Sequence, residues 1–148
     1  MSPYERLASL IGSELGVSDW FEITQGRIDA FADATEDHQW IHVDRELAAA
    51  GPFGRPIAHG FLTLSLLPFL SGQIPLPVEQ PKMGINYGLD KVRFIAPVPV
   101  GSNVRARAVL SEVTEIPRGV QVKRTVTVEV EGSEKPACVA ETISRLLW

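Results

Sequence analysis

The feature that most constrains the fold is an almost wholly apolar segment at residues 60–72, in which only Thr63, Ser65 and Ser71 are polar. A helix without a polar face is usually covered by other structure. The segment is far too short to cross a bilayer. We therefore expect a helix that the rest of the chain buries, with Pro68 bending or weakening its last turn.

The second half of the chain predicts the strands that could cover such a helix. Alternating or strongly β-forming residues fill the stretches 84–96, 103–115, 120–130 and 136–147. The alternation is strictest where Val126, Val128 and Val130 share one face. Short turns are expected at residues 118–119 and 131–133. Long strands joined by short turns predict an antiparallel meander.

The first half predicts short helices. Thr24 is expected to cap a helix that ends near residues 34–36. A second helix should begin after Asp44, which can cap its first turn, and stop at Gly51 in a left-handed conformation. Residues 73–81 are rich in proline and should form a loop.

Together these elements indicate an α+β fold. We expect a single domain, residues 1–148, in which an antiparallel sheet wraps around a central apolar helix and the helices lie to one face. The terminal strands leave open sheet edges. A homodimer formed through an edge or through a face of the sheet would cover them.

The composition argues against several classes of function. Lys and Arg number 14 and Asp and Glu 18, for a net charge of −4, so no basic excess exists to neutralise a nucleic acid. Cys138 is the only cysteine, which excludes an intrachain disulfide and a cysteine-rich zinc site and indicates a reducing compartment, the cytoplasm. Residues 1–12 lack the pattern of a secretory signal, and no stretch is long enough to span a membrane.

All 3 histidines lie between residues 38 and 59, with acidic residues around the first two. Asp37 and His42 are the candidate catalytic pair, because a carboxylate and an imidazole on one turn can converge on one water molecule. The carboxylate can accept a hydrogen bond from that water, and the imidazole can exchange its proton near neutral pH. The alternative is structural, with Asp37 ending a turn and His42 hydrogen-bonded in a partly buried position.

The same segment could also suggest a metal site. His38 and His42 have the spacing of two metal ligands on a helix, and Asp44 is near them in the sequence. Two histidines without a clear third ligand make a poor zinc site, so we expect no metal here.

Two further residues could contact a substrate. Gly60 begins the apolar helix, where a free backbone N–H could hold a carbonyl oxygen that becomes an oxyanion. Alternatively, this glycine only relieves a tight entry from loop to helix. Asn86 is polar within an otherwise apolar strand and could face a pocket, although such a residue is often a cross-strand hydrogen-bond partner.

Several of these segments resemble a known family, the MaoC-like dehydratases. The sequences FADATEDHQWIH at residues 31–42 and FGRPIAHG at residues 53–60 are similar to the (R)-specific hydratase motif of that family. INYGLDKVRF at residues 85–94 and the following APVPVG resemble its NodN-type branch. The resemblance covers roughly residues 20–145.

The resemblance implies a hot-dog fold, a homodimer and one reaction. That reaction is the addition of water to a trans-2-enoyl thioester of coenzyme A or acyl carrier protein, giving the (R)-3-hydroxyacyl thioester, and its reversal. No metal or redox cofactor is implied. At the matching positions, Asp37 and His42 would be the catalytic residues, and the Gly60 N–H would be the oxyanion-hole donor.

The chain departs from the family motif at three neighbouring positions. Glu36, Gln39 and Trp40 stand where the family has glycine, asparagine and proline. Gln39 could still bind substrate in place of asparagine, with a longer reach. Trp40 should change the backbone of the loop and could narrow the pocket.

Two other functions remain open on the sequence alone. The same fold supports thioesterases, in which the polar pair would activate water against the thioester carbonyl. The position of Asp37 and His42 before the apolar helix, rather than an acidic residue on it, favours hydration. The altered loop also allows a non-catalytic protein that binds acyl thioesters.

Overall fold

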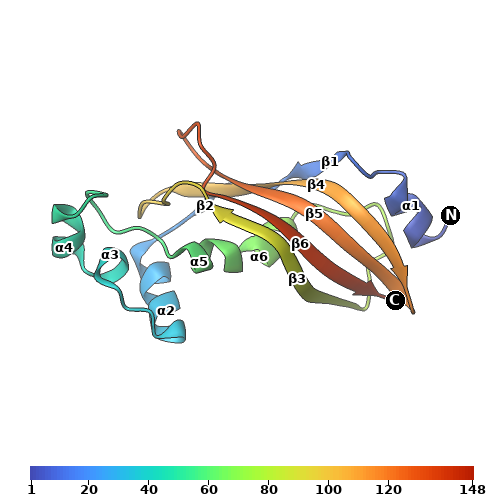
Figure 1. Ribbon diagram of the computed structural model, residues 1–148, viewed down its shortest axis with the longest axis horizontal. Helices are drawn as coiled ribbons and strands as arrows, with labels where there is room; N and C mark the ends of the chain where they lie inside the picture. The colour runs from blue at the N-terminus through green and yellow to red at the C-terminus, as the bar shows by residue number, and fades with distance from the viewer.

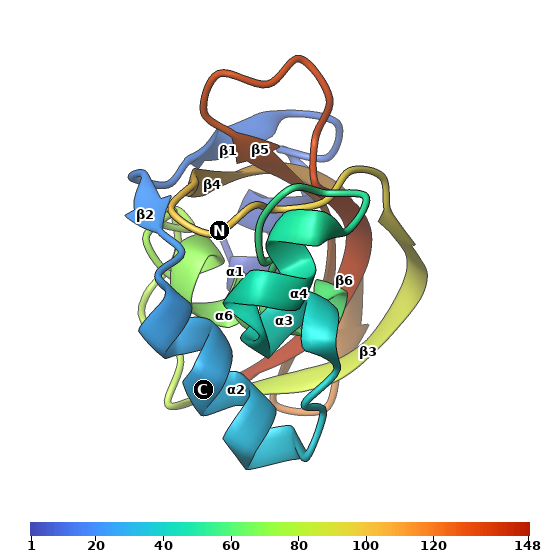
Figure 2. The same ribbon diagram turned by 90° about the vertical axis from the view of Figure 1, so that its left-hand side faces the viewer.

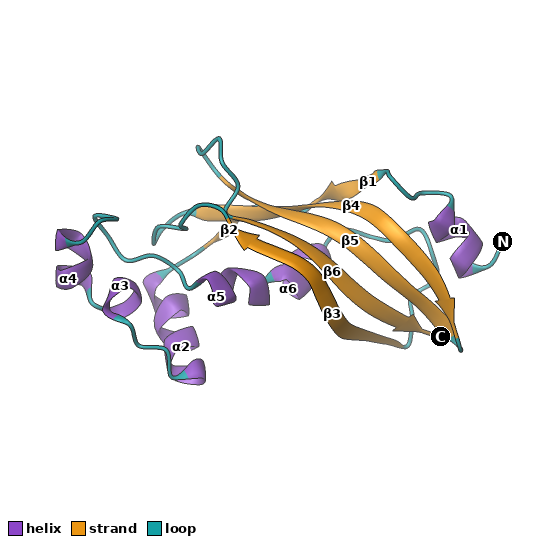
Figure 3. Cartoon of the chain, viewed as in Figure 1, coloured by secondary structure: helices purple, strands orange, loops and turns teal.

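A curved antiparallel sheet covers a row of short helices in the computed structural model, which describes residues 1–148 (Figures 1 and 3). The strands are β1 (Glu14–Val17), β2 (Phe21–Glu22), β3 (Met83–Phe94), β4 (Asn103–Ile116), β5 (Gly119–Val130) and β6 (Cys138–Leu147). The helices are α1 (Pro3–Ala8), α2 (Gln25–Thr35), α3 (Trp40–Val43), α4 (Arg45–Ala50), α5 (Gly60–Ser65) and α6 (Leu67–Ser71). No helix is long and apolar enough to cross a membrane.

The sheet confirms the long predicted strands and corrects their order. Its strands run β1-β4-β5-β6-β3, and β2 also pairs with β4. The predicted meander is therefore correct for β4, β5 and β6 but wrong for β3, which pairs with β6 and forms an edge. The reason lies in the proline-rich link after β3. It pairs with the loop before α5, where the Ala58 N–H donates to the Val98 carbonyl at 2.8 Å, instead of folding back as a hairpin.

The apolar segment forms two helices rather than one. The helical pattern is interrupted at Leu66, and α6 starts with Pro68 in its first turn, where a missing N–H does no harm. Pro68 has no N–H to donate to the turn before it. The helix therefore breaks between α5 and α6, earlier in the segment than the last turn, where we expected the weakening. One face of the two helices packs under the sheet, whereas Phe61 and Phe69 on the other face are 67% and 52% exposed.

The caps of the first-half helices follow the sequence, with one exception. Thr24 accepts a hydrogen bond from the Arg27 N–H at 3.2 Å, and Asp44 accepts one from the Leu47 N–H at 3.0 Å. Gly51 is not left-handed as predicted, because its φ is −86°. A side chain there would instead meet the ring of Trp40, 2.9 Å from the position of its Cβ, so this glycine is explained by packing.

The N-terminal elements α1, β1 and β2 were not predicted from the sequence. A capping box between Ser2 and Glu5 begins α1, and the two short strands pair with β4. Elements this short show too little periodicity to be recognised. At the opposite end of the sheet, α2, α3 and α4 pack together (Figure 2), and the loop between α2 and α3 carries the candidate site.

Candidate active site

Asp37 lies in the loop directly after α2. The chain leaves the helix at Glu36, which adopts a left-handed conformation with φ 63°, and this turn directs Asp37 back toward the core. One oxygen of the Asp37 carboxylate faces the Gln39 N–H at 3.4 Å, which is the local contact of a turn. The Asp37 side chain remains exposed and free to meet a substrate.

His42 is held with one ring nitrogen free. It lies on α3 and is 6% exposed, and its Nδ1 donates to the Ile57 carbonyl oxygen at 2.7 Å. Because a carbonyl can only accept, the proton of the neutral ring is on Nδ1, and Nε2 is left with a lone pair. Burial lowers the pKa of His42 despite that hydrogen bond, so the ring is neutral at pH 7 and can act as a base.

His59 supports both residues of the pair. It is 2% exposed at the start of α5, and its Nε2 donates to the backbone carbonyl of Asp37 at 2.9 Å. Its ring stacks on that of His42, with centroids 3.9 Å apart and planes 22° apart. Sequence reasoning named this residue only as part of a motif. Its contact with Asp37 spans 22 residues and depends on the fold.

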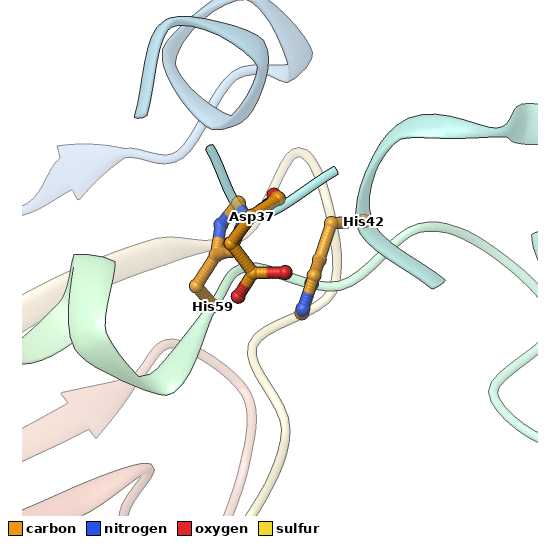
Figure 4. Close-up of side chains that lie close together, drawn as sticks. All are labelled: Asp37, His42 and His59. Atoms are coloured by element: carbon orange, nitrogen blue, oxygen red, sulfur yellow. The ribbon is translucent and has the colours of Figure 1, made fainter. Parts of the chain in front are cut away.

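Asp37, His42 and His59 form one cluster, in which one ligand atom from each lies within 4.8 Å of the others (Figure 4). The stacked rings argue against a metal centre, because lone pairs in nearly parallel ring planes do not point at one tetrahedral ion. His38, the other histidine considered for a metal, instead pairs with Asp33 at 2.9 Å. That contact raises the pKa of His38.

Gly60 follows His59 as the first residue of α5. Its N–H has no acceptor within the helix, as expected for a first-turn position, and is available to a ligand. A Cβ at this position would lie 3.0 Å from the ring of Phe94. Close packing against Phe94 therefore favours glycine at this position, while the role of its N–H as a donor to substrate stays a prediction.

Of the remaining two predicted residues, one lies beside the cluster and the other in a pocket next to it. Gln39 is exposed and makes no side-chain cap for α3, and its backbone contacts Asp37. Asn86 is opposite Ser144 in the β3–β6 pairing and lines a pocket of about 540 Å³ between the sheet and helices α5 and α6. The structure thus brings Asp37 and His42 together next to Gly60, and puts Asn86 in a neighbouring pocket.

Comparison with known proteins gives consistent matches over this whole arrangement. Residues 6–132 match the family described as "MaoC like domain". The chain is 61% identical over 140 residues to 3-hydroxyacyl-thioester dehydratase Z of Mycobacterium tuberculosis, covering 94% of this chain and 92% of that protein. It is 51% identical over 140 residues to nodulation protein N of Rhizobium leguminosarum, covering 92% and 86%.

A solved structure gives the same match in three dimensions. The (R)-hydratase from Aeromonas caviae superposes with a TM-score of 0.75 at 29% sequence identity, over 92% of this chain and 96% of that one. The structural similarity therefore extends over nearly the whole of both chains.

Proposed function

The chain belongs to the MaoC-like domain family, and from that premise we propose that Asp37 and His42 catalyse its reaction. The protein is a hydro-lyase that interconverts trans-2-enoyl and (R)-3-hydroxyacyl thioesters. Its curved antiparallel sheet over short apolar helices is the hot-dog fold that the resemblance predicted. Two observations carry the proposal for the pair: the His42 ring lies close to the Asp37 carboxylate, and its Nδ1 is bonded to Ile57, which leaves Nε2 free.

In this proposal one water molecule lies between the two side chains. His42 Nε2 removes a proton from it as its oxygen attacks C3 of the enoyl chain. Asp37 orients the water, then accepts that proton from His42 and delivers it to C2. One O–H bond of water is broken, the C3–O and C2–H bonds form, and both side chains return to their starting states. Hydroxyl and proton arrive from the same side of the double bond, so the addition is syn.

The thioester carbonyl would accept a hydrogen bond from the Gly60 N–H. Negative charge develops on that oxygen when water adds at C3, and a fixed donor stabilises the enolate more than the ground state. The Gly60 N–H would then contact the carbonyl end of the conjugated enoyl thioester, and Asp37 and His42 would act at its C2=C3 double bond. Gln39, at the exposed side of Asp37, is the proposed contact to the rest of the thioester.

The pocket of about 540 Å³ is the proposed site of the acyl chain. It is lined by Leu64 and Leu67 from the helices and by Leu89 from β3, and it begins about one turn along α5 from Gly60. Leucine side chains suit a hydrocarbon chain. Asn86 would lie in this part of the site. Coenzyme A and acyl carrier protein are both compatible carriers, because the carrier would lie outside the pocket.

We also propose that the protein acts as a homodimer joined through β3. This strand is an edge of the sheet, and nearly every residue in it is exposed. The exposed apolar side chains in and after it are Met83, Ile85, Tyr87, Leu89, Phe94 and Ile95. A long apolar edge strand tends to pair with another strand, and in a twofold-symmetric dimer its partner would be the same strand of the second copy.

The function is tested with purified protein and crotonyl-CoA. Loss of the enoyl-thioester absorbance, without release of free thiol, is the expected result. The product should be oxidised only by an (R)-specific 3-hydroxyacyl-CoA dehydrogenase. Release of thiol without hydration would identify a thioesterase. Tight binding of acyl-CoA without turnover would identify a binding protein, and either result would overturn the proposal.

A further inference from the structure

The concave face of the sheet carries one charged side chain among apolar ones. On β5, Val120, Val122, Val126 and Val128 point toward the helices and are at most 2% exposed. Arg124 occupies the middle position of this row, because the β5–β6 pairing is continuous and side chains alternate along it. Placing a guanidinium in such a row costs free energy unless an anion or several acceptors surround it.

Next to Arg124, the neighbouring strands place uncharged polar side chains on the same, otherwise apolar face of the sheet. Thr142 of β6 lies opposite Arg124, Ser144 is two residues further along, and Asn86 of β3 lies opposite Ser144. All four residues line the pocket of about 540 Å³. This polar band separates the core of 18 residues under α5 and α6 from the smaller cluster of 6 residues around Leu7.

Arg124 has no anionic partner within the chain. Its one side-chain hydrogen bond is weak, from Nη2 to Ser144 Oγ at 3.4 Å, and its buried Nε has no acceptor. Burial lowers the pKa of Arg124, and no acidic group opposes that effect. The adjacent Lys123, on the other face of β5, pairs with both Asp90 and Glu112. Arg124 is thus a guanidinium with unused donors that face a pocket.

The other residues that line the pocket indicate which kind of molecule could bind there. Leu64 and Leu67 line the pocket from the central helices and Leu89 lines it from β3, so the occupant has an apolar part as well as a group that accepts hydrogen bonds. A small inorganic anion would leave these leucines unused. A carboxylate at the end of a hydrocarbon chain uses both parts, because the arginine fork matches a carboxylate in two parallel hydrogen bonds.

The pocket also lies at the correct place for the distal end of a substrate. Helix α5 leads from Gly60 to Ser65, which lines the pocket, a path of ~8 Å at the rise of an α-helix. A thioester whose carbonyl is held at Gly60 would therefore run along α5. Its far end would reach the polar band on the sheet.

We propose that this enzyme prefers acyl thioesters whose chain ends in a carboxylate, and that Arg124 binds that carboxylate with help from Asn86, Thr142 and Ser144. The inference rests on the proposed function and deepens it by naming the substrate class. Asn86 then contacts the end of the acyl chain rather than the reacting carbons, consistent with its distance from the Asp37–His42 cluster.

The test compares two substrates of equal length, trans-2-octenoyl-CoA and its counterpart with a terminal carboxylate, trans-2-octenedioyl-CoA. The wild-type protein should show a kcat/KM about tenfold or more higher for the carboxylate-ended substrate, as expected for a charged hydrogen-bonded pair. Arg124→Met should abolish or reverse this ratio while retaining hydration of crotonyl-CoA. Arg124→Lys keeps the charge but loses the fork, and should give an intermediate ratio.

Lys123→Met is the matched control, since it removes a positive charge one residue away on the other face of β5, and it should keep the wild-type ratio. A wild-type ratio of one or less, or the same ratio in Arg124→Met, would overturn the inference. The wild-type ratio decides the question even if neither Arg124 variant folds. Failure of the wild-type protein with crotonyl-CoA and both longer substrates would instead contradict the proposed function.

Discussion

The Nδ1 atom of His42 donates to the Ile57 carbonyl, and this one contact determines the chemistry that the ring can perform. The tautomer is fixed, Nε2 is the free base, and burial keeps the ring neutral. His59 adds to this by stacking on the ring and by holding the backbone of Asp37. The two proposed catalytic side chains are thus positioned by contacts from Ile57 and His59, which lie outside residues 37–42.

The pH profile of hydration should reflect His42. Its pKa is lowered from 6.5, first by burial and then by the nearby His59, so the base stays unprotonated until the pH falls below that value. We expect kcat/KM for crotonyl-CoA to be constant near pH 7 and to fall on the acid side below 6.5. His38→Asn, which removes an exposed histidine, should leave the profile unchanged. An acid limb above pH 6.5 would contradict this assignment.

Substitution of His59 tests its positioning role. His59→Phe keeps a ring against His42 but removes the hydrogen bond to the Asp37 carbonyl and the electrostatic effect on His42. We expect kcat to fall on the order of tenfold with little change in KM. The acid limb should also move to higher pH. A lower kcat with an unmoved limb would mean that His59 only supports the fold.

Sequence reasoning named Asp37 and His42 as a candidate pair, and the structure brings them together, but it did not identify the residues that hold them. Asp37 and His42 are only five residues apart, in the loop after α2 and on the short helix α3, so their proximity could be predicted from spacing and from the motif. The roles of His59 and Arg124 depend on packing between segments far apart in the chain. Arg124 did leave a signal, because it interrupts an alternating row of valines in residues 120–130.

The end of α2 shows how one element prepares the site. Glu36 takes the left-handed conformation that turns the chain toward the core, at the position where the family motif has glycine. The left-handed conformation costs free energy for a residue with a Cβ, whereas glycine adopts it without that cost. Glu36 at this position therefore costs stability but still makes the left-handed turn.

Glu36→Gly should stabilise the protein. Relief of the left-handed strain is worth about 1 kcal/mol, or about 3 °C in Tm for a chain of this size. Thermal unfolding followed by circular dichroism measures the change. Glu36→Ala is the control, because it removes the same charge but keeps a Cβ, and its Tm should not rise in the same way. Equal gains from both variants would assign the effect to charge.

At the level of elements, local patterns predicted the strands and caps correctly, whereas the place of β3 in the sheet was predicted wrongly. The long strands and the caps at Thr24 and Asp44 follow from periodicity and side-chain chemistry. The edge position of β3 follows instead from the pairing of the 95–102 link with the loop before α5, which no local pattern shows. Gly51 was misinterpreted because the need for glycine came from the ring of Trp40.

For the whole molecule, the decisive feature is the uncovered edge at β3. The strand lines the pocket through Asn86, Tyr87 and Leu89, and its outer edge is open. A second copy paired along this edge would enclose the acyl pocket and cover its exposed apolar residues. In that arrangement, dimer formation would also complete the wall of the substrate pocket.

A charge on this edge should break the dimer. Ile85→Lys puts one positive charge from each copy into the proposed β3–β3 interface, where like charges on paired strands repel. Light scattering after size-exclusion chromatography should show a dimer for the wild-type protein and a shift to monomer for the variant, with loss of hydratase activity. Ile11→Lys changes another exposed isoleucine away from β3 and should remain dimeric. A monomeric wild-type protein with full activity would refute this proposal.

The most direct test of the central claim is the kcat/KM for crotonyl-CoA of Asp37→Asn beside that of Asp33→Asn, a nearby exposed aspartate that pairs with His38. The amide keeps the shape of the Asp37 side chain but cannot relay a proton. We predict a loss of about a hundredfold or more for Asp37→Asn at unchanged Tm, and near wild-type activity for Asp33→Asn. Full hydratase activity in Asp37→Asn would contradict the assignment of Asp37 and His42 as the catalytic pair.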